Sequence, residues 1–482
     1  MHNNVRSLAG QPQQALATAI GLVVAAQAGF ALAAETEDKP HANTVELGSI
    51  SVQDRALDDD SYQAKKPASP KYTEPLRDIP QTITVIPKKV IEDQNLLTMR
   101  DILSTVPGIT FGAGEGGGGF GDSINLRGFS ASNDIYVDGV RDSAQYSRTD
   151  PFNLEQVEVV NGASSAYSGA GAAGGTINLV TKSAQADTFT KLSGGLGTDN
   201  YQRITVDTNQ MINDSAAFRL NLMAHQNDVP GRDEENFERW GIAPSLTFGL
   251  GTPTQVTVNY EHQDDKNMPQ YGVPILDGQI LPGADWDDYY GYSNINTQEI
   301  TTDALNLKFE HEFSEQVSIR NFSRVAQVQQ LTRTSGPEGT YCLANGSQAS
   351  GAACPAGLQP GLYRPAGGSQ GAARDTNNTI YTNQTDLTTR FATGFIDHTL
   401  VTGMAFTREE YDAHTGNWMR TENGSTVTPP DNSIGDPDDH WDGASNFYTT
   451  AKIDGELNNR AAYAFDTLKL NEQWELNGGL RY

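Results

Sequence analysis

The chain has 482 residues and a formal charge of −27, from 33 Lys and Arg against 60 Asp and Glu. This length exceeds one ordinary globular domain, so more than one module is expected. The acidic balance argues against a nucleic-acid partner, which calls for a basic surface. After the first 34 residues, no segment offers about 18 apolar residues without charge, which excludes a bundle of transmembrane helices. With 37% hydrophobic residues and 48 Gly, the averages are those of a soluble protein, unless apolar and polar residues alternate as in a transmembrane β-barrel.

Residues 1–34 have the composition of a secretory signal peptide. They contain no Asp or Glu, Arg6 precedes an apolar stretch, and Ala31-Leu32-Ala33 fits an A-x-A cleavage pattern. The alternative is a retained membrane anchor, but Gln27 and Gly29 interrupt the apolar run. We therefore expect export.

Export would place the two cysteines in an oxidising compartment. Cys342 and Cys354 lie close together in a Gly/Ala/Pro-rich stretch, which favours a loop disulfide. The alternative, a reduced metal-binding pair, lacks a nearby His or third Cys. No metal site is expected.

Residues 35–71 are polar and are predicted to form a flexible arm. Within them lies the segment 45–52, in which the apolar side chains of Ile50 and Val52 alternate with serines. Such a segment can add as a strand to the edge of a partner's sheet.

Residues 79–182 predict a small α+β domain. Thr98 and Asp101 form a capping-box pattern, and Met99, Ile102, Leu103 and Val106 then follow on one helix face. Short strands are expected at 80–87, 135–137, 157–160 and 176–180, with a turn at Asp138-Gly139 after the second. The Gly-rich stretch 112–121 contains a formal G-x-G-x-x-G, but an extended segment and not a helix follows it, so a dinucleotide site is rejected. It is either a linker or a loop at a binding surface.

These motifs, in this order, resemble the plug domain of TonB-dependent outer-membrane receptors. The motifs are Pro80-Gln81-Thr82-Ile83-Thr84-Val85, Asp101-Ile102-Leu103, Val106-Pro107-Gly108-Ile109, Leu126-Arg127-Gly128-Phe129, Tyr136-Val137-Asp138-Gly139, Glu155-Gln156-Val157-Glu158-Val159 and Gly174-Gly175-Thr176-Ile177-Asn178-Leu179. The stretch from Phe111 to Gly116, followed by Asp138 to Asp142, is most similar to the catecholate siderophore receptors. The chain departs from the family at Gly162-Ala163-Ser164-Ser165, and at Tyr167-Ser168-Gly169-Ala170-Gly171, where a family Arg is missing. That Arg would pair the plug with the barrel, so coupling or plug stability could differ.

From residue 188 onward, stretches of alternating apolar and polar residues predict roughly ten complete β-strands and an eleventh begun. Short connections at 213–215, 251–254, 314–316, 394–397 and 471–473 alternate with long ones at 227–238, 266–301, 332–378 and 414–458. Short periplasmic turns and long extracellular loops are typical of an outer-membrane barrel, whereas a β-sandwich has no reason to keep this parity.

The predicted fold is therefore an α+β plug inside a transmembrane antiparallel β-barrel. We expect a signal peptide at 1–34, the arm at 35–71, the plug at 72–184 and barrel strands at 185–482. The resemblance implies about 22 strands, as in large plugged transporters, and this chain carries about half. An open barrel edge in lipid is unfavourable, so we expect an N-terminal fragment whose reading frame continues past Tyr482.

The resemblance implies an importer of ferric siderophores, of the catecholate class, that works as a monomer among outer-membrane lipid and lipopolysaccharide. Energy would come from the partner TonB, which the resemblance places on a TonB box at 45–52, with contacts from Val45, Glu46, Leu47, Ser49, Ile50 and Val52. No cofactor is expected, because the ferric iron belongs to the cargo. No paired nucleophile and base, and no zinc or nucleotide motif, was found, so no enzyme is predicted.

An anionic, aromatic ferric tris-catecholate calls for Arg and aromatic side chains on the plug apex and the long loops. The candidates are Phe111, Glu115, Phe120, Arg141, Tyr146, Arg148, Arg333, Tyr341, Tyr363, Arg364 and Arg374. Taken one at a time, an ion pair at the surface or at the plug–barrel boundary explains each Arg better. Arg127 is expected to brace the plug against the barrel. Open alternatives are another cargo, such as a hydroxamate siderophore, haem or cobalamin, and a surface adhesin, which would not explain the plug motifs.

Overall fold

The structure, a computed structural model, describes residues 61–112, 123–131, 134–142, 149–169, 173–366 and 371–482. The expected signal peptide and the candidate TonB box lie outside the described residues. Among the residues it does describe, no helix has both the length and the apolar composition needed to cross a membrane.

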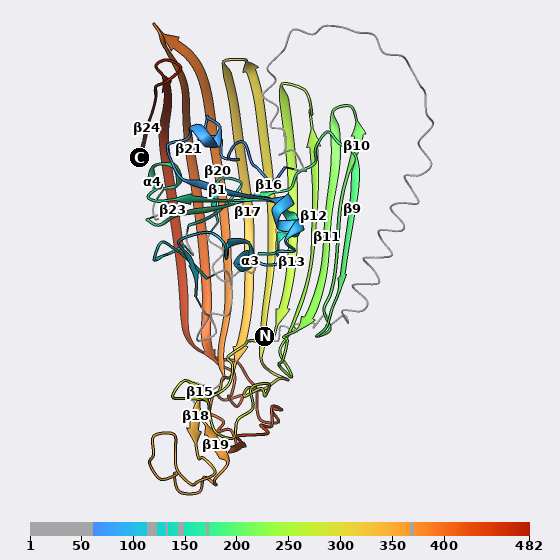
Figure 1. The fold of residues 1–482 in the computed structure, drawn as a ribbon, viewed down its shortest axis with the longest axis vertical. Coiled ribbons are helices and arrows are strands. Elements are labelled where there is room, and N and C mark those ends of the chain that lie inside the picture. Colours follow the sequence, from blue (N-terminus) through green and yellow to red (C-terminus); the bar gives the residue numbers. More distant parts are fainter. Residues whose placement is uncertain (1–60, 113–122, 132–133, 143–148, 170–172, 367–370) are drawn as a thin grey trace, which may run out of the picture. The chain divides into compact units, whose positions relative to one another are not determined.

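Eleven long antiparallel strands form one sheet, which we call the wall (Figure 1). Their order follows the chain from β9 at one edge to β24 at the other. This matches the predicted ten complete strands and an eleventh begun. The strands are β9 (Phe189–Leu196), β10 (Gln202–Asn213), β11 (Ala216–Asp228), β12 (Asn236–Phe248), β13 (Thr254–Asn267), β16 (Thr297–Ser314), β17 (Val317–Thr334), β20 (Ala372–Thr393), β21 (Ile396–Asn417), β23 (Tyr448–Lys469) and β24 (Glu475–Arg481).

The predicted alternation of short and long connections is confirmed, but the strands run further into the long connections than expected. In the described residues, the long connections leave the wall at 229–235, 268–296, 335–366 and 418–447. The largest error is at β23, which begins at Tyr448 and pairs there with Asn417, eleven residues before the predicted start at 459. Its first half has a sparse apolar face of Ala451, Ile453 and Leu457, interrupted by Gly455, so its alternation is weak. Pairing with β21 extends the strand over this half.

A small α+β unit, the plug, packs against one face of the wall. Its main sheet has the order β1-β7-β8-β5-β6, and a second sheet joins β2, β3 and β4. Its elements are η1 (Leu76–Asp78), β1 (Ile83–Pro87), α2 (Lys88–Asp93), α3 (Met99–Leu103), β2 (Ile109–Phe111), β3 (Ile124–Leu126), β4 (Phe129–Ser130), β5 (Ile135–Val137), β6 (Val140–Asp142), η2 (Pro151–Asn153), β7 (Leu154–Asn161), α4 (Ser165–Ser168) and β8 (Gly175–Thr181).

Local sequence signals determine several of these elements. Thr98 accepts a hydrogen bond from the Asp101 amide, and the Asp101 side chain accepts one from the Thr98 amide, so the predicted capping box starts α3. Asp138 and Gly139 both have positive φ, 51° and 85°, as a two-residue turn between β5 and β6 requires. The predicted helix face lies in the plug's own hydrophobic core, although Val106 follows the end of α3.

Short strands in the long connections lie together at one end of the wall (Figure 1). β14 (Ile275–Leu276) pairs with β15 (Gln279–Ile280), and β18 (Gly339–Tyr341), β19 (Leu362–Pro365) and β22 (Asn432–Ser433) form a three-stranded sheet. Three connections share an apolar core that includes Leu281, Tyr363 and Ile434. The predicted disulfide between Cys342 and Cys354 is present. The long connections are thus a packed module and not loose loops.

Candidate functional site

The plug is held to the wall by three groups of buried charges. In the first, Asp150 at the start of η2 accepts hydrogen bonds from Arg203 of β10, at 2.7 and 3.0 Å, and from Arg239 of β12, at 3.0 Å. Arg239 also pairs with Asp265 of β13. Burial alone would raise the pKa of Asp150, but the two guanidinium groups lower it to about 2. This carboxylate therefore ties the plug to two strands at once.

The second group surrounds Asp207 of β10. Lys182, just after β8, approaches it at 3.0 Å, Lys88 of α2 at 3.5 Å, and Arg219 of β11 at 2.8 Å. Arg219 also reaches Glu155 of β7 at 3.3 Å. Two plug lysines and one plug glutamate thus share a network with the wall, and their side chains are almost fully buried.

The third group holds the β5–β6 hairpin. Arg324 of β17 pairs with Asp142 of β6 at 3.0 Å and donates to Asn306 of β16 at 3.0 Å. Arg320 of β17 donates to the carbonyl of Asp138 at 3.2 Å. The hairpin that carries the Asp138-Gly139 turn is therefore fixed to the wall by two arginines.

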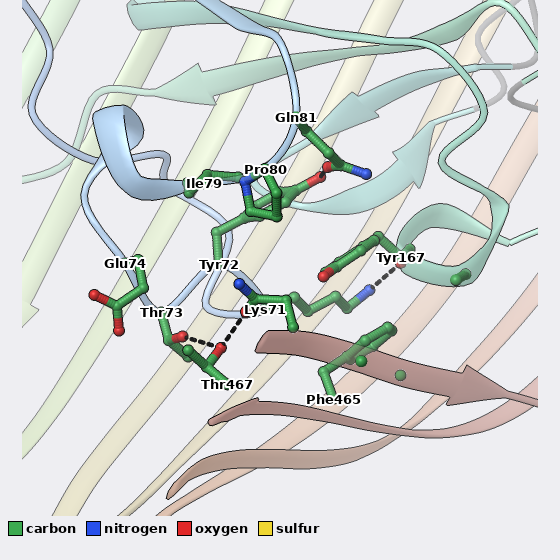
Figure 2. Close-up of a pocket in the computed structure, with 14 residues that line it drawn as sticks. Lys71, Tyr72, Thr73, Glu74, Ile79, Pro80, Gln81, Tyr167, Phe465 and Thr467 are labelled. Atoms are coloured by element: carbon green, nitrogen blue, oxygen red, sulfur yellow. Dashed lines mark hydrogen bonds between the residues drawn. The ribbon is translucent and has the colours of Figure 1, made fainter. Parts of the chain in front are cut away.

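The plug also contacts the wall at its β23–β24 edge, around a cavity of about 220 Å³ that residues 71–81 line together with these two strands (Figure 2). The Tyr167 ring of α4 stacks between Tyr72 and Phe465, with centroid distances of 4.9 and 4.4 Å. Lys71 donates to the Tyr167 carbonyl at 2.8 Å, and burial lowers its pKa to about 8. Thr73 and Thr467 share a hydrogen bond of 2.9 Å. The prediction that the arm is flexible as far as residue 71 is therefore wrong at its end, because Lys71 is buried here.

Two of the predicted ligand residues of the plug are described, and they lie apart from each other in the fold. The Phe111 ring on β2 packs beside the plug core and under the Arg100 guanidinium, at 4.9 Å. Arg141 on β6 lies opposite Tyr136, whose hydroxyl donates to the carbonyl of Ser168 on α4. Glu115, Phe120, Tyr146 and Arg148 lie outside the described residues.

The predicted ligand residues on β18 and β19 serve the packing of the long connections. Tyr341 and Tyr363 stack at 4.9 Å, and burial raises the pKa of both hydroxyls. Arg364 makes a bidentate ion pair with Asp431, with Nε to Oδ1 at 2.6 Å and Nη2 to Oδ2 at 2.8 Å. Tyr341 and Tyr363 are thus brought together within the packed module, whereas Arg364 follows Tyr363 on β19, points to the other face and has a side chain that is 40% exposed.

The two remaining arginines point to opposite faces of the wall. Arg374 and Asp386 of β20 are both at even-numbered positions, so their side chains lie on the same face of the strand, where Asp386 is buried toward the plug. Arg333 of β17 shares the odd-numbered face of Val325, which is 44% exposed. Because side chains alternate along a strand, only Arg374 is directed to the interior face.

Arg127 does not have the predicted bracing contact among the described residues. Its side chain is exposed, and it lies beside Gly108 and Gly162 of the plug itself. Asp150, Asp142, Lys182 and Lys88 brace the plug instead. Sequence reasoning missed them, although charged residues at interior-facing strand positions, such as Asp207 and Arg239, were a usable signal.

A plug with its own core, fixed by buried charges to the inner face of long antiparallel strands, defines the class of plugged outer-membrane receptors. The chain matches the TonB-dependent receptor plug domain over residues 75–176 and the TonB-dependent receptor-like β-barrel over residues 239–482. It therefore belongs to the TonB-dependent receptor family, whose members lie in the outer membrane of Gram-negative bacteria.

Among its relatives is the catecholate siderophore receptor Fiu of Escherichia coli, 36% identical over 438 residues, which are 87% of this chain and 54% of Fiu. The closed form of Fiu from E. coli K12 superposes with a TM-score of 0.75 at 34% identity, over 87% of this chain and 58% of that one. The siderophore receptor PiuA of Acinetobacter baumannii also gives a TM-score of 0.75, at 30% identity, over 88% and 60% of the two chains. The chain thus spans just over half the length of these relatives.

Proposed function

We propose that this chain forms the plug and wall strands of a receptor that imports ferric siderophores of the catecholate class. The observation that carries the proposal is the likeness to a catecholate siderophore receptor over most of the chain, at 36% identity. We divide the chain at residues 72–184 for the plug and 185–482 for the barrel strands. Ferric iron enters as cargo, with no resident cofactor and no enzymatic step.

The acidic net charge restricts where an anionic cargo can bind. The chain carries a formal charge of −27, so an anion needs a local basic position, and Arg374 provides one on the interior face of the wall. A guanidinium binds planar oxygen anions through paired hydrogen bonds.

Growth under iron starvation tests the cargo. A strain lacking the gene is compared with the complemented strain on ferric tris-catecholates, ferric hydroxamates and haem. We expect complementation to restore growth only on the tris-catecholates. Restoration on a hydroxamate or on haem alone would replace the proposed cargo.

We further propose that residues 45–52 recruit TonB as a strand-forming segment. Deletion of 45–52 should abolish uptake and leave ligand binding intact. The matched control deletes the next eight residues, 53–60, which shortens the arm equally and should allow uptake. Equal uptake by both deletion variants would reject the placement.

A further inference from the structure

A row of polar side chains crosses four neighbouring strands of the wall at the end where the long connections leave. The register places Asn267 of β13 opposite Gln298 of β16, Gln298 opposite Thr332 of β17, and Thr332 opposite Arg374 of β20. Residues directly opposed in antiparallel strands have Cβ atoms about 5 Å apart on one face. Gln330, two positions before Thr332, donates to the Thr332 hydroxyl at 3.0 Å. We call these five residues the amide row.

The amide row faces the interior. Asn267 lies two positions from Asp265, which pairs with Arg239 in the first group of buried charges. Thr332 lies eight positions from Arg324, which pairs with Asp142 of the plug. Side chains an even number of positions apart share a face of a strand. At about 3.3 Å per residue, the row is roughly 26 Å along β17 from the Arg324 contact, toward the long connections.

Several atoms of the row are buried without a hydrogen-bond partner. Asn267, Gln298 and Gln330 are 3%, 0% and 2% exposed. Within the described part of the chain, both amide atoms of Asn267, both of Gln298 and the Oε1 atom of Gln330 lack hydrogen-bond partners. A buried polar group left unpaired costs about 1–3 kcal/mol. In the plug-facing part of the wall, Asn306 accepts a hydrogen bond from Arg324 at 3.0 Å, although single atoms such as Asn221 Nδ2 lack a partner there too among the described residues.

We propose that the amide row is a ligand subsite that hydrogen-bonds the oxygen-rich organic part of the anionic chelate; this rests on the proposed function. Asn and Gln offer both N–H donors and carbonyl acceptors, which suit catecholate oxygens and the amide groups that link them. Arg374 adds one positive charge at the end of the row. Because the amides are buried, the chelate reaches them only when covering segments move.

Single substitutions on the two faces of β17 and on β16 test the subsite in the intact receptor. Gln330→Leu and Gln298→Leu remove amides of the row, while Gln329→Leu changes the same residue type one position away, on the exposed opposite face. The probe is the ferric tris-catecholate complex of 2,3-dihydroxybenzoate, and the readout is Kd from fluorescence quenching of purified receptor.

We expect each row variant to bind the probe at least tenfold more weakly, and Gln329→Leu to bind it like the wild type. Gln298→Glu, nearly isosteric and negatively charged, should weaken binding further, and it serves if a leucine variant does not fold. If the row variants bind the probe with the wild-type Kd, the amides bind only water. That result would overturn the subsite and leave the proposed function standing. A wild-type receptor that fails to bind the probe would instead refute the catecholate cargo, and the subsite with it.

Discussion

Asp150→Asn should loosen the plug from β10 and β12. The asparagine keeps the side-chain oxygen that accepts from the Phe152 amide at 2.9 Å, so the start of η2 can persist. It removes the negative charge that pairs with Arg203, and one of the two carboxylates that pair with Arg239, the other being Asp265. The Asp150 side chain is fully buried, and those of the two arginines are at most 9% exposed.

Removing one partner of a buried ion pair costs about 3–5 kcal/mol, and each 1.36 kcal/mol is a factor of ten in an equilibrium. Local opening at residues 150–161 should therefore rise by roughly 100-fold or more. Hydrogen exchange of the purified receptor, followed by mass spectrometry, measures this directly in peptides covering η2 and β7. The control is Asp78→Asn, because Asp78 pairs with the adjacent, exposed Arg77 at 3.2 Å, and exposed pairs contribute little. Exchange in Asp150→Asn within threefold of the wild type would refute the anchoring role.

Three further predictions concern single features. Lys71→Met should stabilise the segment 61–81 at pH 7 and not above pH 10.5. Burial lowers the pKa of the Lys71 amine to about 8, so between pH 8 and 10.5 the native state binds fewer protons than the unfolded state, and wild-type stability rises with pH through that window. A pH series of hydrogen exchange that shows no such rise would contradict this. Gly175→Ala should destabilise the plug by more than about 1 kcal/mol, since φ is 139° and a Cβ would lie 2.1 Å from the Val160 carbonyl oxygen; an unchanged melting temperature would count against it. Replacing Cys342 and Cys354 together by Ala should expose residues 336–365 to limited proteolysis without affecting the plug; an unaltered cleavage pattern would show that packing alone holds the module.

The elements that sequence predicted best are those with local causes. The capping box at Thr98, the Asp138-Gly139 turn and the strand alternation each depend on a few neighbouring residues, and all three are present. The disulfide followed from the composition around the two cysteines. The first half of β23 was missed because Gly455 interrupts its sparse apolar face, and pairing with β21 completes the strand.

The candidate site was predicted less well, because its contacts join residues far apart in sequence. Arg364 was selected as a ligand residue by type, yet its partner Asp431 is 67 positions away. Arg333 and Arg374 looked equivalent until the register assigned them to opposite faces. Asp150 could not be chosen as an anchor, since neither Arg203 nor Arg239 is near it in the chain.

The way in which the plug is attached has a consequence for its release. The apolar core of the plug is closed within itself, whereas its attachment to β10–β13 and β17 consists largely of charges and hydrogen bonds. When such a contact opens, water can hydrogen-bond to the plug group and to the wall group at once. The net loss of free energy is small, because hydrogen bonds to water replace those within the protein. The same interface made of leucines would expose apolar area on opening, at about 25 cal/mol per Å². A hydrated passage beside an intact plug is therefore a low-energy state of this architecture.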